Sequence, residues 1–478
     1  MNQGTSLAPL TGVLRHWPRL LTSSVAALLA TLVAAGLLGK LAFLVHKPQW
    51  IHAADAAVIA LALGLALRFT RRQPAWSPSP RVFRALLLAG CLLRLLVLLH
   101  DVVDRPEPYS DFLVHEQLGQ RIAFEHAYYE PRAGGVLLRA YRPFGLPLLL
   151  APFDLALGPR WGPLALYHAL SLGVLLLWHH ILRHQRNAYA ALALAYLALT
   201  PNALAVASFA NTQLPFLFFL TLTLLVLQRA TPSRLQAATL GALMATLLAL
   251  RLYAPIVPAA IVHALDSRGW RRATRRWLVL ALAAAAVVYA PWVLRNYEVF
   301  GRFLPGFTAW GRYQTLAVDD ITKAGLYNEG HPPGFLASHP VIDELQWKHD
   351  LDAAADAWIL AHPLRHLQSL PFRAVHFMDN QTWATDVVFA HSALAQWPRL
   401  HFALGRIDLA AFWLVVAVAA LAWLRRPPSD ALSRLLLLQY LLAALPLVIF
   451  LECWSRYHYP FFLLPLLALA LRADPRAT

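Results

Sequence analysis

Charged residues are scarce in this chain of 478 residues. Asp, Glu, Lys and Arg make up 14% of it and hydrophobic residues 59%, whereas a soluble globular domain has about 25% charged and 45–50% apolar residues. The apolar residues come in long runs instead of alternating at helical or strand spacing, and the mean hydropathy is +0.51. Such runs face lipid or other apolar helices on all sides. The composition excludes a water-soluble protein and predicts a multi-pass helical membrane protein.

Cysteine and lysine are also rare. The two cysteines, Cys91 and Cys453, form neither a disulfide framework nor a metal-ligand spacing. Arg supplies most of the net charge of +16, and it sits mainly in short hinges between apolar runs, where basic residues set membrane topology. A nucleic-acid partner is therefore not expected. The dominance of Ala, Leu and Arg is typical of a GC-rich bacterial genome, which predicts a bacterial source.

The lengths of the apolar runs predict the fold class. A run of about 20 residues crosses the hydrocarbon core of a bilayer. Measured against that length, the sequence predicts an all-α, multi-pass transmembrane bundle of about 12 spans. The Arg-rich hinges all fall on one side of the membrane only if two conditions hold. Phe144–Leu157 must enter the membrane only halfway, and Leu235–Leu265 must be a hairpin broken near Arg251 and Pro255. We adopt both conditions.

The distribution of charge predicts the orientation. Basic hinges mark the cytoplasmic side, and most carboxylates lie in two long loops that fall on the other side. We expect a bacterial inner (cytoplasmic) membrane protein with both termini cytoplasmic. The predicted segments are N-terminal spans in 1–100, a first exoplasmic loop in 101–162, a central bundle in 163–294, a second exoplasmic loop in 295–406 and C-terminal spans in 407–478. Chemistry that needs carboxylates must then occur at the exoplasmic face.

Several short motifs occur in a recognisable order from the third span onward. They are Tyr109-Ser110-Asp111, Tyr141-Arg142-Pro143-Phe144-Gly145, Pro291-Trp292-Val293-Leu294-Arg295, Ala361-His362-Pro363 and Arg456-Tyr457-His458-Tyr459-Pro460. This order resembles the GT-C superfamily of glycosyltransferases, in particular the branch that uses polyprenyl-phosphate sugars. That branch includes the protein mannosyltransferases and the lipid A aminoarabinose transferases.

The resemblance implies a reaction and its partners. It implies inverting transfer of a sugar, a hexose or a pentose, from a polyprenyl-phosphate carrier to an acceptor hydroxyl at the exoplasmic (periplasmic) membrane face. The expected partners are the lipid bilayer, the polyprenyl-phosphate-linked sugar donor and a glycan, lipid or protein acceptor of the cell envelope. The sugar, the acceptor and the length of the prenyl chain are left open by the sequence.

Asp111 is the candidate general base. A hydroxyl is a poor nucleophile, so a carboxylate must accept its proton as the new bond forms. Asp111 occupies the position of the family's first-loop aspartate, at the predicted start of a helix over 112–124. Asp104 and Asp101 are competing carboxylates nearby. In the alternative interpretation Asp111, or Ser110, only caps that helix.

Cations near the membrane level are the candidates for binding the carrier phosphate, since Arg offers a bidentate fork to phosphate oxygens. The candidates are Arg456 with Tyr457, Arg295, Arg251 and Arg142. The alternative is that these Arg side chains only reach for lipid headgroups. No cofactor is certain, but His115 lies four residues after Asp111, so a divalent metal ion could bind between them on one helix face.

Two other functions remain open at this stage. A transporter or flippase for a lipid-linked sugar would need charged groups near the bilayer midplane. The few candidates are Arg94, Asp154 and His168, and we expect them toward the exoplasmic half of the membrane. A ligase of the O-antigen type would also use exoplasmic Arg and His residues, but it does not need a first-loop carboxylate. The importance of Asp111 therefore separates the transferase from the ligase.

Overall fold

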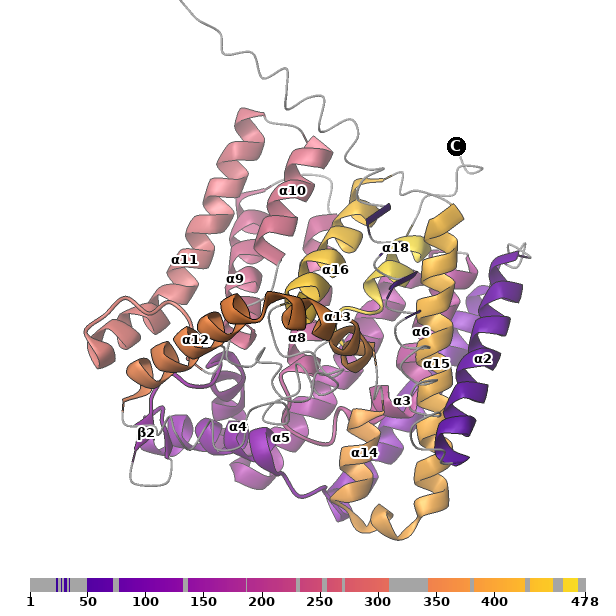
Figure 1. Cartoon of the computed structure of the whole chain (residues 1–478), viewed down its shortest axis with the longest axis horizontal. Helices are drawn as coiled ribbons and strands as arrows, with labels where there is room; N and C mark the ends of the chain where they lie inside the picture. Colours follow the sequence, from indigo (N-terminus) through magenta and orange to yellow (C-terminus); the bar gives the residue numbers. More distant parts are fainter. Residues whose placement is uncertain are drawn as a thin grey trace, which may run out of the picture.

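The computed structural model is almost entirely helical (Figure 1). It describes residues 50–71, 77–131, 136–185, 187–228, 233–251, 256–268, 271–308, 343–378, 382–425, 430–449 and 459–471, with a few positions between 23 and 34. The helices are α2 (Trp50–Arg71), α3 (Pro80–Val103), α4 (Ser110–Gln120), α5 (Gly145–Leu182), α6 (Ala188–Leu199), α7 (Pro201–Ala205), α8 (Gln213–Gln228), α9 (Arg234–Leu250), α10 (Ile256–Arg268), α11 (Arg272–Phe300), α12 (Glu344–Ala361), α13 (Pro363–Met378), α14 (Trp383–Ala390), α15 (Pro398–Arg425), α16 (Ala431–Ile449) and α18 (Leu464–Ala470). A short π-helical turn, η1 (Arg121–Glu125), continues α4, and a short 3₁₀ turn, η5 (Ala393–Gln396), precedes α15. Two antiparallel strands, β1 (Glu130–Pro131) and β2 (Leu137–Leu138), form a small hairpin.

Six of the described helices are long and apolar enough to cross a membrane: α2, α3, α5, α11, α15 and α16. Three shorter apolar helices, α6, α8 and α9, accompany them. The all-α prediction is confirmed, and six apolar helices of membrane-spanning length support the membrane-protein prediction, but the count of about twelve spans is not confirmed. One reason is that apolar runs can break: the run through 188–207 stops at Thr200, because Pro201 disfavours helical backbone in the residue before it and starts α7.

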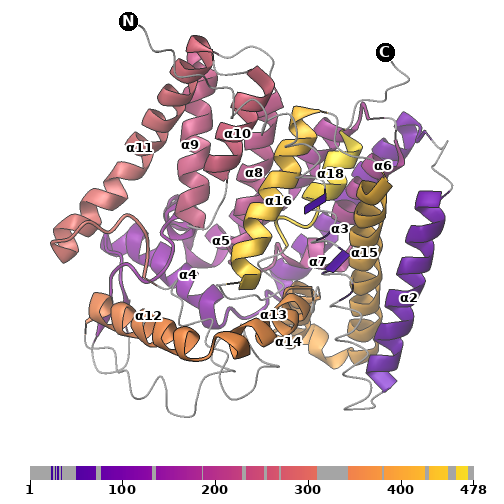
Figure 2. The ribbon, with the colours of Figure 1, turned by 45° about the horizontal axis from the view of Figure 1, so that its top comes forward.

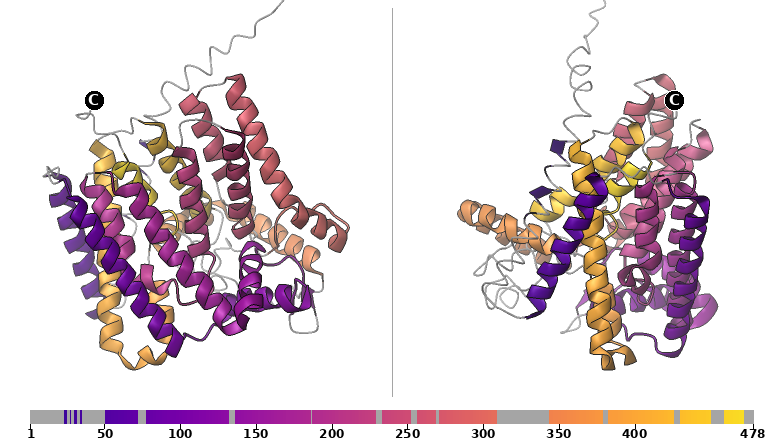
Figure 3. Two further views of the ribbon diagram at one scale, coloured as in Figure 1. Left: turned by 180° about the vertical axis from the view of Figure 1, so that it is seen from behind. Right: turned by 90° about the vertical axis from the view of Figure 1, so that its right-hand side faces the viewer.

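The predicted half-inserted segment is a separate part of α5. Gly158 interrupts that helix with φ 82° and ψ 165°, a backbone conformation that only glycine adopts readily. A Cβ added at Gly162 would lie 2.7 Å from the backbone nitrogen of Asp154, so the two halves fold sharply against each other. The predicted end of the segment at Leu157 is confirmed, and its depth in a membrane stays a prediction. The second half runs beside α3, as the view from behind shows (Figure 3).

Two groups of helices stand on opposite sides of the bundle. Helices α9, α10 and α11 form one group, and α2 packs along α15 in the other (Figure 1). The predicted break in the hairpin is confirmed, because α9 ends at Leu250 and Arg251 has extended backbone. This break directs Arg251 toward the end of the bundle where the first loop lies.

The two long loops are joined through Glu344, the first residue of α12. Its carboxylate accepts hydrogen bonds from the backbone nitrogens of Arg139 (2.5 Å) and Ala140 (3.0 Å) and from the hydroxyl of Thr308 (2.5 Å). Burial raises the pKa of Glu344, against the opposing effect of these donors. Helices α12 and α13 then run across the direction of α2, α15 and α16 (Figure 2).

Close packing of α9 on α11 gives a test of this arrangement. A Cβ at Gly241 would lie 2.2 Å from the carbonyl oxygen of Ala281, so Gly241→Ala must push the two helices apart, at a cost of about 1–3 kcal/mol. Gly64 on α2 is the matched control, since a Cβ there meets nothing within 4 Å and Ala favours helix by about 0.5–1 kcal/mol over Gly. We expect thermal unfolding in detergent to show Gly241→Ala destabilised and Gly64→Ala neutral or stabilised. Equal midpoints for the two variants would contradict the packing.

Candidate active site

A polar cavity lies where the first loop meets the helix ends. It is lined by Asp111, Phe112, His115, Arg142, Pro143, Asn211, Thr212, Gln213, Leu250 and Arg251. It is small, with a volume of about 50 Å³, and it is partly open to the outside. Three stretches far apart in the sequence thus bring together four residues singled out above: Asp111, His115, Arg142 and Arg251.

Asp111 is held by an ion pair instead of acting as a helix cap. The residue that caps α4 is Tyr109, and it makes no side-chain capping bond, so the interpretation of Asp111 or Ser110 as the cap is wrong. Ser110 has φ 49°, a left-handed conformation that is costly for a residue with a Cβ. One oxygen of Asp111, Oδ1, lies 2.8 Å from Nη2 of Arg142. The strained turn and the ion pair both fix the direction of the carboxylate.

Arg142 connects two carboxylates. Besides Asp111, its Nε donates to Oε2 of Glu130 at 3.2 Å, and Glu130 is itself buried in β1. Burial lowers the pKa of Arg142, but the negative charges of Asp111 and Glu130 outweigh this effect, so that the pKa is raised overall. Arg142 therefore stays charged beside the cavity at any physiological pH.

Arg251 brings a second positive charge to the same cavity. Its side chain is 1% exposed, and Nε and Nη2 both donate to the hydroxyl of Thr212, at 3.1 and 2.8 Å. The end of α9 reaches this position because Gly145 lets α5 approach closely: a Cβ there would lie 2.7 Å from the carbonyl carbon of Ala249. Gly145, the last residue of the Arg142-Pro143-Phe144-Gly145 motif, thus permits the close contact that brings Arg251 to the cavity.

His115 lines the cavity one helical turn after Asp111, as the spacing predicts. A metal site needs more ligands than these two. Within the described part of the chain, no group of three or more His, Cys, Asp or Glu side chains is placed to hold a metal ion.

The loop before α8 contributes residues that the sequence analysis missed. Asn211 is fully engaged in shaping this loop, since its amide donates to the carbonyls of Val206 and Phe209 and its oxygen accepts from the backbone nitrogen of Leu214. Gln213 is 3% exposed and lines the cavity. The signal was present in the sequence as three polar residues in a row, Asn211-Thr212-Gln213, between apolar runs.

Arg295 lies outside the lining of the cavity and supports the first loop. It donates to the carbonyls of Arg139 at 2.6 Å and Tyr128 at 2.9 Å. Its guanidinium also lies within 5.5 Å of the ring centroid of Tyr128 and 5.2 Å of that of Trp292. Arg295 of the Pro291–Arg295 motif therefore holds the backbone on both sides of the β1–β2 hairpin. Arg456 and Tyr457 lie outside the described residues.

The two competing carboxylates also lie elsewhere. Oδ2 of Asp104 accepts a hydrogen bond from the backbone nitrogen of Ala393 at 2.6 Å. The side chain of Asp101 is fully buried between Nδ1 of His100, at 2.9 Å, and Nε2 of His168, at 3.0 Å. Of the three first-loop aspartates considered, Asp111 is the one that lines the cavity.

Comparisons with models of protein families, with curated proteins and with solved structures found no match. The likeness to the GT-C superfamily therefore rests on the motifs given above.

The ion pairs of Arg142 predict unequal effects of removing each partner. Arg142→Met leaves Asp111 and Glu130 without their shared cation, and removing one partner of this partly buried pair costs about 1–3 kcal/mol. Asp111→Asn keeps the bond between Arg142 and Glu130 and costs less. Thermal unfolding of both variants in the same detergent measures the difference, and a larger loss in Asp111→Asn would contradict this account of the cavity.

Proposed function

We propose that this chain is an integral membrane glycosyltransferase that moves a sugar from a polyprenyl-phosphate carrier to an acceptor hydroxyl. The observation that carries the proposal is the meeting of one carboxylate, Asp111, with the half-buried Arg142 and the buried Arg251 in one cavity. A carboxylate and fixed cations are the groups that this reaction needs.

In the proposed reaction the negative carboxylate and the positive guanidinium have separate roles. The acceptor oxygen attacks the anomeric carbon, and the bond from that carbon to the phosphate oxygen breaks. Asp111 takes the hydroxyl proton, while the electron pair of the broken bond leaves with the polyprenyl phosphate. Arg251, held by Thr212, stabilises the negative charge on the leaving phosphate. Attack from the face opposite the phosphate gives inversion.

Arg142 has a positioning role in this scheme. Its bond to Oδ1 orients the carboxylate of Asp111, and Glu130 in turn orients Arg142. Arg456 and Tyr457 remain proposed ligands of the carrier phosphate on the strength of the motif. Arg295 has a structural role, because it contacts Trp292 and Tyr128 and so supports the first loop. The bacterial inner membrane and a periplasmic active site are part of the proposal.

A flippase for a lipid-linked sugar is the second candidate, and one observation favours it. The carboxylate of Asp154 is fully buried within α5, and neither oxygen has a hydrogen bond to a described residue. Buried acidic groups inside membrane helices are common on transport pathways. The other two residues considered for transport do not add to this: Arg94 is bonded to Ser171 and Leu197, and His168 to Asp101.

Asp111→Asn is expected to abolish transfer and to leave the fold and donor binding nearly intact. The amide keeps the shape of the side chain but cannot accept the proton, and loss of a general base costs about 10²–10⁴-fold in rate. The assay is transfer from a synthetic polyprenyl-phosphate sugar to lipid A or envelope glycan in proteoliposomes. Asp104→Asn is the control and should retain most activity. Near wild-type transfer by Asp111→Asn would reject the assignment, and transport without transfer by the wild type would favour the flippase.

The two arginines predict a contrast in carrier binding. Arg251→Gln removes a charge-assisted contact worth about 1.5–3 kcal/mol, so the dissociation constant for polyprenyl phosphate should rise about 10–100-fold. Arg251→Lys should restore part of this affinity, since a point charge replaces a fork. Arg295→Gln should lower the unfolding temperature and change binding little. Scintillation proximity or native mass spectrometry measures the affinities, and a larger binding defect in Arg295→Gln would exchange the two roles.

A further inference from the structure

Gln213, the first residue of α8, is a buried polar side chain whose amide the fold does not use. It is 3% exposed, and its Oε1 has no hydrogen-bond partner in the described part of the chain. A buried amide that forms no hydrogen bond destabilises the folded state, because it has lost its contacts with water without gaining others. Since Gln213 lines the cavity around Asp111, a ligand in that cavity can supply the missing partner.

The polar residues beside Gln213 are already engaged, and they fix the loop that carries it. The amide of Asn211 donates to two backbone carbonyls of this loop. The backbone carbonyl of Asn211 accepts from the buried hydroxyl of Tyr167 at 2.5 Å, and the hydroxyl of Thr212 accepts from Arg251 at 2.8 Å. Gln213 therefore sits on a fixed loop, while its own amide is not part of the bonds that hold that loop. Such a group binds a ligand without first having to be ordered.

The charges of the cavity lining indicate which kind of ligand group Gln213 meets. Among the described lining residues, the guanidinium groups of Arg142 and Arg251 face one carboxylate, Asp111, which is itself paired with Arg142 at 2.8 Å. Protonation of His115 adds to this positive excess. The excess suits a phosphate and repels an ammonium group. For the sugar, the described lining offers a neutral amide instead of an uncommitted carboxylate.

We propose that Gln213 binds a hydroxyl group of the donor sugar, and that this sugar carries no positive charge. A hydroxyl both donates and accepts hydrogen bonds, so it pairs with either end of the amide, whichever end faces the cavity. The cavity is small and partly open, so one hydroxyl enters it and the rest of the sugar lies at its mouth. Gln213 then determines specificity: it favours a neutral sugar over the same sugar with an ammonium group. This inference rests on the proposed function, because it concerns the sugar on the carrier.

The test measures the binding of three synthetic ligands to the full chain in nanodiscs. They are polyprenyl phosphate, polyprenyl-phosphate arabinose and polyprenyl-phosphate aminoarabinose, in which an ammonium group replaces one hydroxyl. The wild type should bind the arabinose carrier about 3–10-fold more tightly than the aminoarabinose carrier. Gln213→Leu should weaken binding of the arabinose carrier about 3–10-fold and leave polyprenyl phosphate unchanged, since one neutral hydrogen bond to the sugar is lost. Gln213→Glu should reverse the preference between the two sugars, because it adds a negative charge.

Gln439→Leu is the matched control. Gln439 in α16 is also buried and neither end of its amide has a hydrogen-bond partner among the described residues, but it does not line the cavity. It should change none of the three affinities. Both Leu variants should unfold at or above the wild-type temperature, because each removes a buried amide that has no partner. A weaker binding of the arabinose carrier in Gln213→Leu alone is then an effect on the site and not on the fold.

The outcomes separate this inference from the proposed function. Equal affinities of the wild type for the three ligands would overturn the inference, and so would an equal loss in Gln213→Leu for carriers with and without sugar. Tighter binding of the aminoarabinose carrier by the wild type would overturn the neutral sugar. In these cases polyprenyl phosphate still binds and the proposed function stands. If the wild type binds no polyprenyl phosphate, the proposed function is rejected and the inference with it.

Discussion

The ion pair between Arg142 and Asp111 is the interaction on which the candidate site depends. It joins the start of α4 to the segment after the β1–β2 hairpin, and Glu130 extends it to the hairpin itself. A charged guanidinium that is largely buried must have anionic partners, and the carboxylates in turn need the cation. This mutual requirement holds the carboxylate of Asp111 in one direction.

The two long loops are interlocked around that pair. Glu344 ties α12 to the residues after β2, and Tyr109, directly before α4, stacks on His391 with ring centroids 3.9 Å apart. The backbone nitrogen of Glu107 also donates to the carbonyl of His391. Because residues far apart in sequence close onto each other, the position of Asp111 depends on both loops.

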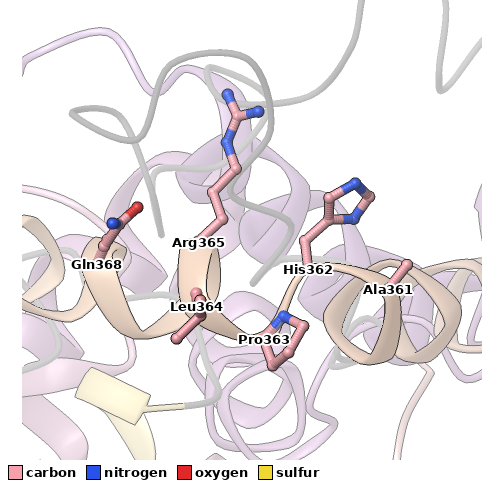
Figure 4. A pocket seen from close by; sticks show the side chains of 6 residues that line it. All are labelled: Ala361, His362, Pro363, Leu364, Arg365 and Gln368. Atoms are coloured by element: carbon pink, nitrogen blue, oxygen red, sulfur yellow. The ribbon is translucent and has the colours of Figure 1, made fainter.

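Arginine has different roles in different places, although its chemistry is the same. Arg142 and Arg251 line the cavity, whereas Arg295 and Arg373 donate to backbone carbonyls and hold segments together. Arg365 is half-buried where α12 meets α13 (Figure 4). In a bilayer an Arg side chain must find oxygen atoms, whether from phosphate, carboxylate or a helix end. Which of these oxygen atoms an Arg side chain binds depends on the groups that the fold places around it.

The sequence by itself determined the all-helical membrane class, the break after α9, the boundary at Leu157 and the choice of Asp111, His115, Arg142 and Arg251 as candidates. Composition, run length and local motifs carry this information because burial in lipid and Gly or Pro backbone effects are local. Only the tertiary structure decided that Arg295 lies outside the cavity and that Asp101 and Asp104 are bonded elsewhere. It also decided that Leu364 and Leu367 of α13 are exposed. These outcomes depend on which residues, distant in sequence, complete each hydrogen bond or ion pair. A local sequence pattern therefore cannot predict these partners.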